Sequence, residues 1–163
     1  MNAKQQRGAT LIEVLVAMVI LAIGLLGLAG LQSVSVQSNQ GAYYRSQATI
    51  LANDMADRMR ANRTAALAGS YALTTFPAPS TSNAITGTPA QRDTGQWLNN
   101  LAATLPQGTG TIVTSGKIVT LTICWNDSRA RIKSTQYVAS QNDSCTSTAE
   151  NSGFEVFSYR TRL

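Results

Sequence analysis

The stretch Gly8-Ala-Thr-Leu-Ile-Glu-Val-Leu-Val-Ala-Met-Val-Ile-Leu-Ala-Ile-Gly-Leu-Leu-Gly-Leu-Ala-Gly-Leu31 decides how the rest of the chain is interpreted. From Ala9 to Leu31 the run is almost wholly apolar, and only Thr10 and Glu13 interrupt it. A helix over this run is about 34 Å long, which is enough to cross the hydrocarbon core of a bilayer. The residues before it are polar and cationic, which predicts that they stay in the cytoplasm while the body of the protein lies across the membrane.

The polar leader and the start of the apolar run resemble a known processing signal. Lys4, Arg7, Gly8 and Ala9-Thr-Leu-Ile-Glu13 are similar to the class III leader of type IV pilins and of type II secretion pseudopilins. The resemblance implies that prepilin peptidase cuts after Gly8 and methylates the new N-terminus at Ala9. It also implies that Glu13 pairs with the N-terminus of a neighbouring subunit. Phenylalanine is the commonest family residue where this chain has Ala9, and substitutions there are tolerated.

Physical chemistry also indicates a role for Glu13, independently of the resemblance. An ionisable side chain within a hydrocarbon-facing helix costs roughly 2.5 kcal/mol or more unless it is paired. Glu13 lies one helical turn from Ala9, so a free amine on an adjacent copy offers the complementary charge. The alternative is that Glu13 is protonated near the headgroups, or only favours the helix N-terminus through the helix dipole.

Three other kinds of N-terminal signal compete with this interpretation. An ordinary secretory signal has a shorter apolar region, although Gly27-Leu-Ala-Gly30 offers small residues for a cut. A lipoprotein anchor needs a cysteine at the end of the run, and the sequence has none there. A plain single-pass anchor remains an alternative.

The residues after the run predict a continued helix from Gln32 to about Ala66, with Gly69 as its stop. Apolar residues recur at spacings of three and four and form one stripe, made of Tyr44, Ala48, Leu51, Met55 and Met59. We expect this stripe to pack on the chain's own sheet, with a partner-binding face as the alternative. Near the end of the helix Arg58, Arg60 and Arg63 suit the helix dipole and are interpreted as a solvated face.

Part of this helix carries a second resemblance. The stretch Gln47-Ala-Thr-Ile-Leu-Ala-Asn-Asp-Met-Ala-Asp-Arg-Met-Arg-Ala-Asn62 is similar to the corresponding helix of PilV-type minor pilins, which modify or initiate pilus assembly. This resemblance favours a pilus subunit over a secretion pseudopilin.

In the C-terminal half the predicted structure changes from helix to strand. Residues 74–95 are rich in Thr, Ser, Pro and Gly and are expected to form a loop. Asp93 is a candidate N-cap for a short helix ending near Pro106, in which Trp97 is interpreted as a core anchor. Strands are predicted over residues 109–114, 117–126 and 154–162, with a weaker candidate over 131–138.

The best of these strands carries one continuous apolar face, formed by Val119, Leu121, Ile123 and Trp125. We expect that face to pack on the long helix. The predicted fold class is therefore α+β and pilin-like: a long N-terminal helix, membrane-spanning in its apolar half and amphipathic in its second half, packed on a small antiparallel β-sheet.

The two cysteines, Cys124 and Cys145, bracket a polar connection. Two cysteines in a chain without histidine do not supply the usual four-ligand zinc site. The expected periplasmic side is oxidising, which favours a disulfide worth roughly 3 kcal/mol in the chain-entropy model over two free thiols. A bridge near the C-terminus delimits a variable surface region in pilins, so the resemblance implies the same pairing.

The composition argues against catalysis. Histidine is absent, so the chain has no Ser–His or Cys–His pair, and it has neither a phosphate-binding glycine loop nor an H-E-x-x-H motif. Asp127 and Asp143 lack the spaced oxygen ligands of a calcium loop. The formal net charge is +5, or 5 − 2 = +3 without Lys4 and Arg7, and no dense cationic cluster indicates a nucleic-acid groove. We expect no enzymatic activity, cofactor, metal, small-molecule substrate or nucleic-acid partner.

The function expected from these features is that of a minor pilin of a type IV pilus, a structural subunit that promotes or initiates pilus assembly. Its expected partners are prepilin peptidase, the major pilin and other minor pilins. It is expected in the inner membrane, as a single-pass protein with a periplasmic domain, and then in the extracellular filament. The alternatives are a type II secretion pseudopilin and a membrane-tethered adhesin or DNA-binding module.

The expected organisation has four parts. These are a cleaved leader (1–8), the membrane-spanning and filament-core half of the helix (9–31), the amphipathic half (32–68) and a periplasmic globular pilin domain (69–163).

Overall fold

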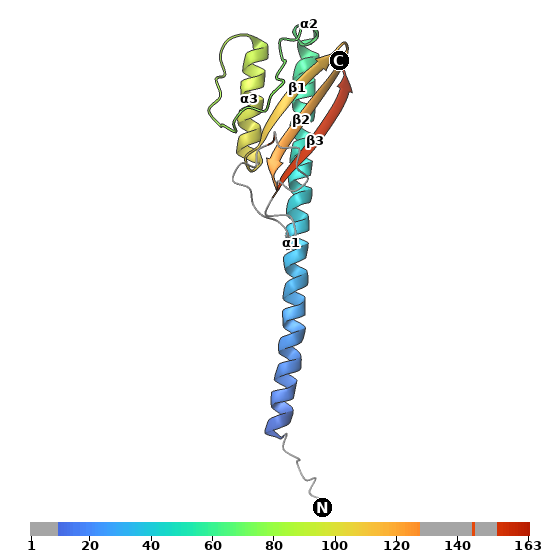
Figure 1. The fold of residues 1–163 in the computed structure, drawn as a ribbon, viewed down its shortest axis with the longest axis vertical. Helices are drawn as coiled ribbons and strands as arrows, with labels where there is room; N and C mark the ends of the chain where they lie inside the picture. The colour runs from blue at the N-terminus through green and yellow to red at the C-terminus, as the bar shows by residue number, and fades with distance from the viewer. Residues whose placement is uncertain (1–9, 128–144, 146–152) are drawn as a thin grey trace, which may run out of the picture. The chain divides into compact units, whose positions relative to one another are not determined.

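The computed structural model describes residues 10–127, 145 and 153–163, and the chain divides into two compact units, residues 1–36 and 37–163. The first unit holds the N-terminal part of α1, the helix that runs from Leu11 to Ala61 (Figure 1). The sequence has no proline before Pro77, so nothing removes a backbone hydrogen bond within this helix. A helix also satisfies every backbone polar group locally, which an apolar segment requires in lipid. The predicted long helix is confirmed.

The second unit joins the C-terminal part of α1 to two shorter helices and one sheet. The helices are α2 (Arg63–Leu67) and α3 (Pro89–Thr104). The strands are β1 (Thr109–Ser115), β2 (Ile118–Asn126) and β3 (Phe154–Arg162), and they form an antiparallel sheet in the order β1-β2-β3. This arrangement is the predicted α+β, pilin-like fold (Figure 1). The weaker strand candidate over 131–138 lies outside the described residues.

The end of the long helical region is slightly more complex than predicted. α1 ends at Ala61, and after Asn62 the chain makes the short helix α2. Gly69 then adopts a φ of +80°, and the amide of Ser70 donates to the carbonyl of Ala65 at 2.9 Å. This left-handed glycine caps the helix C-terminus, so the predicted stop at Gly69 is confirmed.

The start of α3 differs from the prediction. Thr88, not Asp93, is the N-cap: its Oγ1 accepts from the amide of Gln91 at 3.3 Å, and its own amide donates to Oε1 of Gln91 at 2.9 Å. Pro89 stands at the first helical position, where its missing N–H leaves no bond unmade. The capping box and the proline were present in the sequence as the local signal Thr-Pro-Ala-Gln, which outweighs a lone acid farther along. Asp93 lies inside the helix.

The first two strands form a tight hairpin. Their register places Ser115 opposite Ile118 and Thr109 opposite Cys124. The two residues of the turn begin with Gly116, whose φ is +59° while the next residue has no positive φ. This is the pattern of a type II′ turn, whose twist suits antiparallel strands. The three strands observed agree with the predicted ones to within one residue at each end.

The core lies between the helices and one face of the sheet. From α1 it takes residues spaced three and four apart, all at most 9% exposed: Ala48, Leu51, Ala52, Met55, Ala56 and Met59. Tyr44 packs against this cluster while partly buried. The predicted stripe therefore packs within the protein's own core, as expected.

The sheet contributes the apolar face that the sequence predicted. Val119, Leu121, Ile123 and Trp125 are all at most 1% exposed and belong to the same core cluster as the α1 residues. Trp97 of α3 is fully buried, and its Nε1 donates to the carbonyl of Leu51 in α1 at 3.0 Å. Trp97 is thus a core anchor that fixes α3 against α1.

Candidate functional site

The first candidate site is the stem, which we define as the described residues 10–36. It begins with a turn in which the carbonyl of Thr10 accepts from the amides of Glu13 at 2.9 Å and Val14 at 3.3 Å. Glu13 therefore lies in the first turn of α1, where a carboxylate complements the helix dipole. Gly8 and Ala9, the predicted cleavage and methylation positions, lie outside the described residues.

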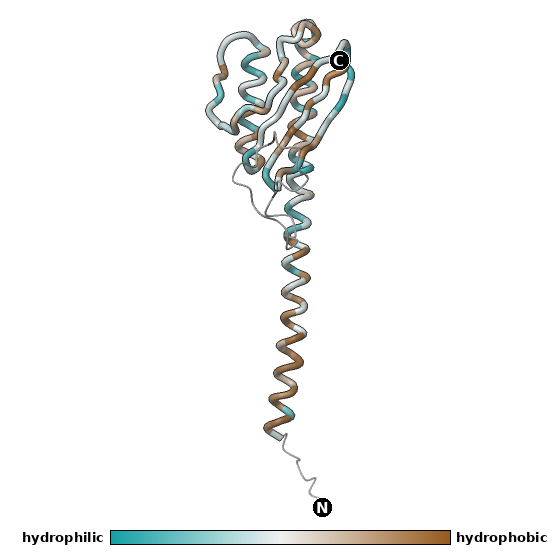
Figure 2. Tube along the Cα trace, viewed as in Figure 1, coloured by the Kyte–Doolittle hydropathy of each residue, from teal (hydrophilic) through white to brown (hydrophobic). Residues whose placement is uncertain are grey.

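The stem has no apolar cover of its own. Large side chains such as Leu11, Leu26 and Leu31 are 79%, 76% and 71% exposed. The most apolar stretch of α1 has a mean hydropathy of 2.8 and none of it is buried (Figure 2). Among the described residues α1 is the one helix that is long and apolar enough to cross a membrane by length and composition. An apolar surface of this kind needs lipid or other apolar helices around it.

A second cluster joins the end of α1 to α3, and we call it the polar junction: Arg58, Asp54, Asp93, Gln96, Tyr71 and Asn62. Arg58 is central, because its Nε donates to Asp54 at 3.0 Å and its Nη1 to Gln96 at 2.8 Å. The same Nη1 lies 3.4 Å from Oδ1 of Asp93.

The polar junction corrects the solvated-face interpretation for Arg58, whereas Arg60 and Arg63 are exposed as predicted. Only 24% of the Arg58 side chain is exposed, and it joins two helices that lie far apart in the sequence. Arg60 pairs with Asp57 at 2.6 Å and donates to Thr161 of β3 at 2.6 Å. Arg63 donates to the carbonyl of Leu163 at 3.4 Å. All three position elements of the body.

Tyr71 completes the polar junction from the segment between α2 and α3. Its hydroxyl donates to Oδ2 of Asp93 at 2.7 Å and accepts from Nδ2 of Asn62 at 3.2 Å. Burial raises the pKa of the Tyr71 phenol above its ordinary value, and the hydrogen bond to Asp93 raises this pKa further. A neutral phenol with satisfied hydrogen bonds indicates a structural role.

The disulfide joins Cys124 of β2 to Cys145, with a sequence separation of 21. Cys124 is fully buried, so the bridge is rooted in the sheet. The predicted pairing is confirmed.

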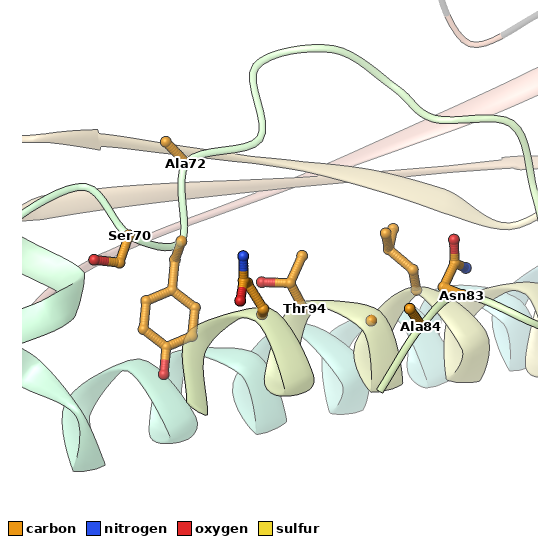
Figure 3. Close-up of a pocket in the computed structure, with 9 residues that line it drawn as sticks. Ser70, Ala72, Asn83, Ala84 and Thr94 are labelled. Carbon is orange, nitrogen blue, oxygen red and sulfur yellow. The ribbon is translucent and has the colours of Figure 1, made fainter. Parts of the chain in front are cut away.

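A groove beside α3 is the remaining candidate (Figure 3). It has a volume of about 300 Å³, and its polar lining includes Asn83, Gln91 and Thr94. These polar groups already bond within the protein: Asn83 bonds with Asn99 and Ser80, Gln91 closes the helix cap, and Thr94 donates to the carbonyl of Ala90 at 2.8 Å. Among the described residues no group of three or more His, Cys, Asp or Glu is placed to hold a metal ion. The groove therefore offers little chemistry for a ligand.

The fold and the stem define the class: an α+β, pilin-like protein with an apolar N-terminal helix. Residues 3–29 match the family model of the prokaryotic N-terminal methylation motif, and residues 30–93 match the family model described as type IV pilin Tt1218. Both matches are consistent with a type IV pilin, and neither specifies the PilV type. No curated protein and no solved structure matches the chain.

These matches indicate the general kind of function and not a specific role in the filament. Pilin families are structural rather than enzymatic, so these two matches support a pilin-type structural subunit. The methylation motif implies processing by prepilin peptidase and assembly with other pilins. The apolar helix and the leader motif fit anchoring in a membrane followed by incorporation into a pilus.

Proposed function

We propose that this chain is a minor pilin of a type IV pilus, a non-enzymatic subunit that promotes or initiates filament assembly. The observation that carries the proposal is the stem: a fully uncovered apolar helix with one acid, Glu13, in its first turn. A discarded signal has no need of such an acid, whereas a helix that bundles with copies and relatives of itself has a partner for it.

The proposed sequence of events begins in the inner membrane, with the body in the periplasm. Prepilin peptidase cuts after Gly8 and methylates Ala9. The stem then leaves the lipid and enters a bundle of pilin stems, in which Glu13 pairs with the N-terminus of a neighbour. Because contacts between successive subunits are heterologous, one such subunit can start a filament as well as extend it. The body needs no cofactor for this role.

The second candidate, a type II secretion pseudopilin, shares the leader and the stem. The match of residues 30–93 to a type IV pilin model supports the pilus over the secretion machine. The similarity of residues 47–62 to PilV-type minor pilins supports a minor rather than a major subunit.

Deletion of the gene distinguishes these roles. For a minor pilin we expect surface pili, counted by electron microscopy, to be lost or sharply reduced, while secretion of folded proteins is unchanged. Loss of protein secretion with normal pili contradicts the proposal and favours the pseudopilin. Normal pili with lost adhesion or DNA uptake favours a membrane-tethered binding module instead.

A further inference from the structure

In the part of the chain that the structure describes, the sheet of the body is open along one side. The outer edge of β1 is blocked at its middle residue, because the amide and carbonyl of Ile112 exchange hydrogen bonds with Leu73 at 2.8 and 2.9 Å. β3 forms the opposite edge and pairs only with β2 within the part of the chain that the structure describes. β3 is nine residues long, whereas strands usually have five or six, so this is a long unpaired edge.

The register identifies which backbone groups face that open edge. In an antiparallel sheet, successive residues direct their N–H and C=O groups to opposite sides of the strand. The N–H and C=O groups of Ile112 point away from β2, because they bond with Leu73, so Ile112 and its partner Leu121 are not hydrogen-bonded to each other. The N–H and C=O groups of Leu121 therefore point towards β3, where they pair with those of Tyr159. The bond from the amide of Leu163 to the carbonyl of Lys117, at 2.9 Å, follows the same alternation.

The residues of β3 that alternate with Tyr159 therefore point outward: Val156, Ser158 and Arg160 direct their N–H and C=O groups away from β2. Within the described residues these groups have no other backbone partner. A row of this kind is a template for an added strand.

The side chains of β3 differ on its two faces. On the core face, Phe157 and Tyr159 pack against the core but are only half-buried, so the apolar layer is incomplete at this edge. On the outer face, Arg160 and Arg162 are exposed. No carboxylate of the described residues pairs with either arginine. Among the described residues, the edge thus combines backbone groups without a strand partner, partly buried aromatic side chains on one face, and unpaired positive charge beside the exposed Val156 on the other.

We propose that β3 is the docking edge for an extended segment of another protein in which apolar and acidic residues alternate. That segment adds a fourth strand to the sheet by backbone hydrogen bonds. Its apolar side chains cover Phe157 and Tyr159, and its acids lie opposite Arg160 and Arg162, where opposite-charge pairs stabilise cross-strand neighbours. A second copy of this chain is a poorer occupant, because its own β3 brings further arginines to the same edge.

Docking at this edge requires neither cleavage of the leader nor filament assembly. A negative result here therefore leaves the proposed pilin role intact, and a failure of that role leaves this edge available.

A designed peptide tests the proposal on the full-length chain in detergent micelles. The probe is an eight-residue peptide of alternating isoleucine and glutamate with blocked ends. Amide hydrogen exchange, followed residue by residue by NMR, is expected to slow by about tenfold or more at Val156, Ser158 and Arg160 when this peptide binds. The matched peptide with lysine in place of glutamate is expected to bind about tenfold more weakly.

Two matched comparisons separate strand addition from simple charge attraction. A glutamate peptide whose strand-facing amides are N-methylated keeps its charge but loses its hydrogen bonds, and we expect its binding to be lost. The double substitution Arg160→Glu and Arg162→Glu is expected to reverse the preference, so that the lysine peptide binds more tightly than the glutamate peptide. Arg92→Glu makes the same kind of charge change on an exposed position of α3 and is expected to leave binding unchanged.

Three results overturn the proposal. The first is that the N-methylated peptide binds as well as the unmodified one, which indicates adsorption by charge alone. The second is that the amides of Val156, Ser158 and Arg160 are already protected in the free chain at every concentration, because its own residues then cover the edge. The third is protection that grows with protein concentration without peptide, which assigns the edge to a second copy.

Discussion

Glu13 is the one charged side chain on a stem whose exposed surface is otherwise almost wholly apolar. In lipid, a lone carboxylate on such a surface is costly, and a complementary charge removes much of that cost. Among assembled stems the N-terminus of a neighbour supplies that charge in our proposal. In this proposal Glu13 stabilises the assembled filament, whereas in the membrane its unpaired charge is destabilising.

Glu13→Val tests this proposed role at the residue scale. We expect normal membrane insertion and normal cleavage, because the substitution makes the stem more apolar. Incorporation into pili is expected to fall by about tenfold, the equivalent of losing roughly 1.4 kcal/mol of pairing. The measurement is an immunoblot of sheared pili against the membrane fraction. Thr10→Val, a polar-to-apolar change in the same turn, serves as the control, and equal incorporation of both variants contradicts the role of Glu13.

Tyr71 gives a residue-scale prediction for the body. Its pKa is raised in the folded state, first by burial and then by the hydrogen bond to Asp93. The folded protein therefore holds the phenolic proton more tightly than the unfolded chain, whose tyrosine pKa is about 10. The resulting stabilisation is complete below about pH 10 and is lost as the pH rises towards the folded pKa.

Tyr71→Phe removes this dependence on pH. At pH 8 we expect the variant to be less stable than the wild type by about 1 kcal/mol, because the hydrogen bonds with Asp93 and Asn62 are lost. At pH 11 we expect this difference to shrink, and urea unfolding of the full chain at both values measures it. Tyr43→Phe, on an exposed tyrosine, is the control. A difference that is constant or larger at pH 11 contradicts the assignment.

At the scale of the elements, local sequence signals predicted most of the fold. The period of two placed all three strands, and the spacing of Ala48, Leu51 and Met55 placed the buried face of α1. The start of α3 was misplaced because Asp93 was weighed without the stronger capping box at Thr88 and Gln91. The surroundings of Arg58 were predicted wrongly for a different reason. It was expected on a solvated face, but some of its partners come from α3, and helix spacing does not reveal which distant element packs beside α1.

The contact between α3 and the preceding loop depends on Gly95. A side chain there meets the backbone carbonyl of Ala84, so the loop can cross the helix only at a glycine. Alanine has the higher helix propensity by about 1 kcal/mol, but displacing backbone costs more, so we expect Gly95→Ala to destabilise the body by about 1–3 kcal/mol. Thermal unfolding followed by circular dichroism measures this. Gly24→Ala, where nothing lies within 4 Å, is expected to leave the melting temperature unchanged, and equal behaviour of the two variants contradicts the packing argument.

The disulfide between Cys124 and Cys145 is expected to stabilise the folded body, because it closes a loop in the unfolded chain and so lowers the entropy of that chain. For a sequence separation of 21, the chain-entropy model gives about 3 kcal/mol. We therefore expect reduction to lower the free energy of unfolding by about that amount in guanidinium titrations. The double variant Cys124→Ala, Cys145→Ala is expected to be insensitive to reductant. A wild type that is equally stable with and without reductant contradicts this expectation.

At the scale of the whole molecule, two units with opposite solvent requirements share one chain. The body from residue 37 onward buries its apolar residues in its own core, whereas the stem buries none of its most apolar stretch. The apolar stretch itself could be read from the sequence, because length and hydropathy are local properties. The open edge of β3 could not be predicted, because strand order is set by non-local pairing.

In the proposed pathway, the stem stays on the mature protein while a short cationic leader is removed. Intact mass and N-terminal sequencing of the protein purified from its own membranes and pili show which residue the mature chain starts with. We expect a chain that starts with N-methylated Ala9 and keeps the disulfide-containing body intact. A mature chain that starts near residue 30, without the stem, contradicts this pathway.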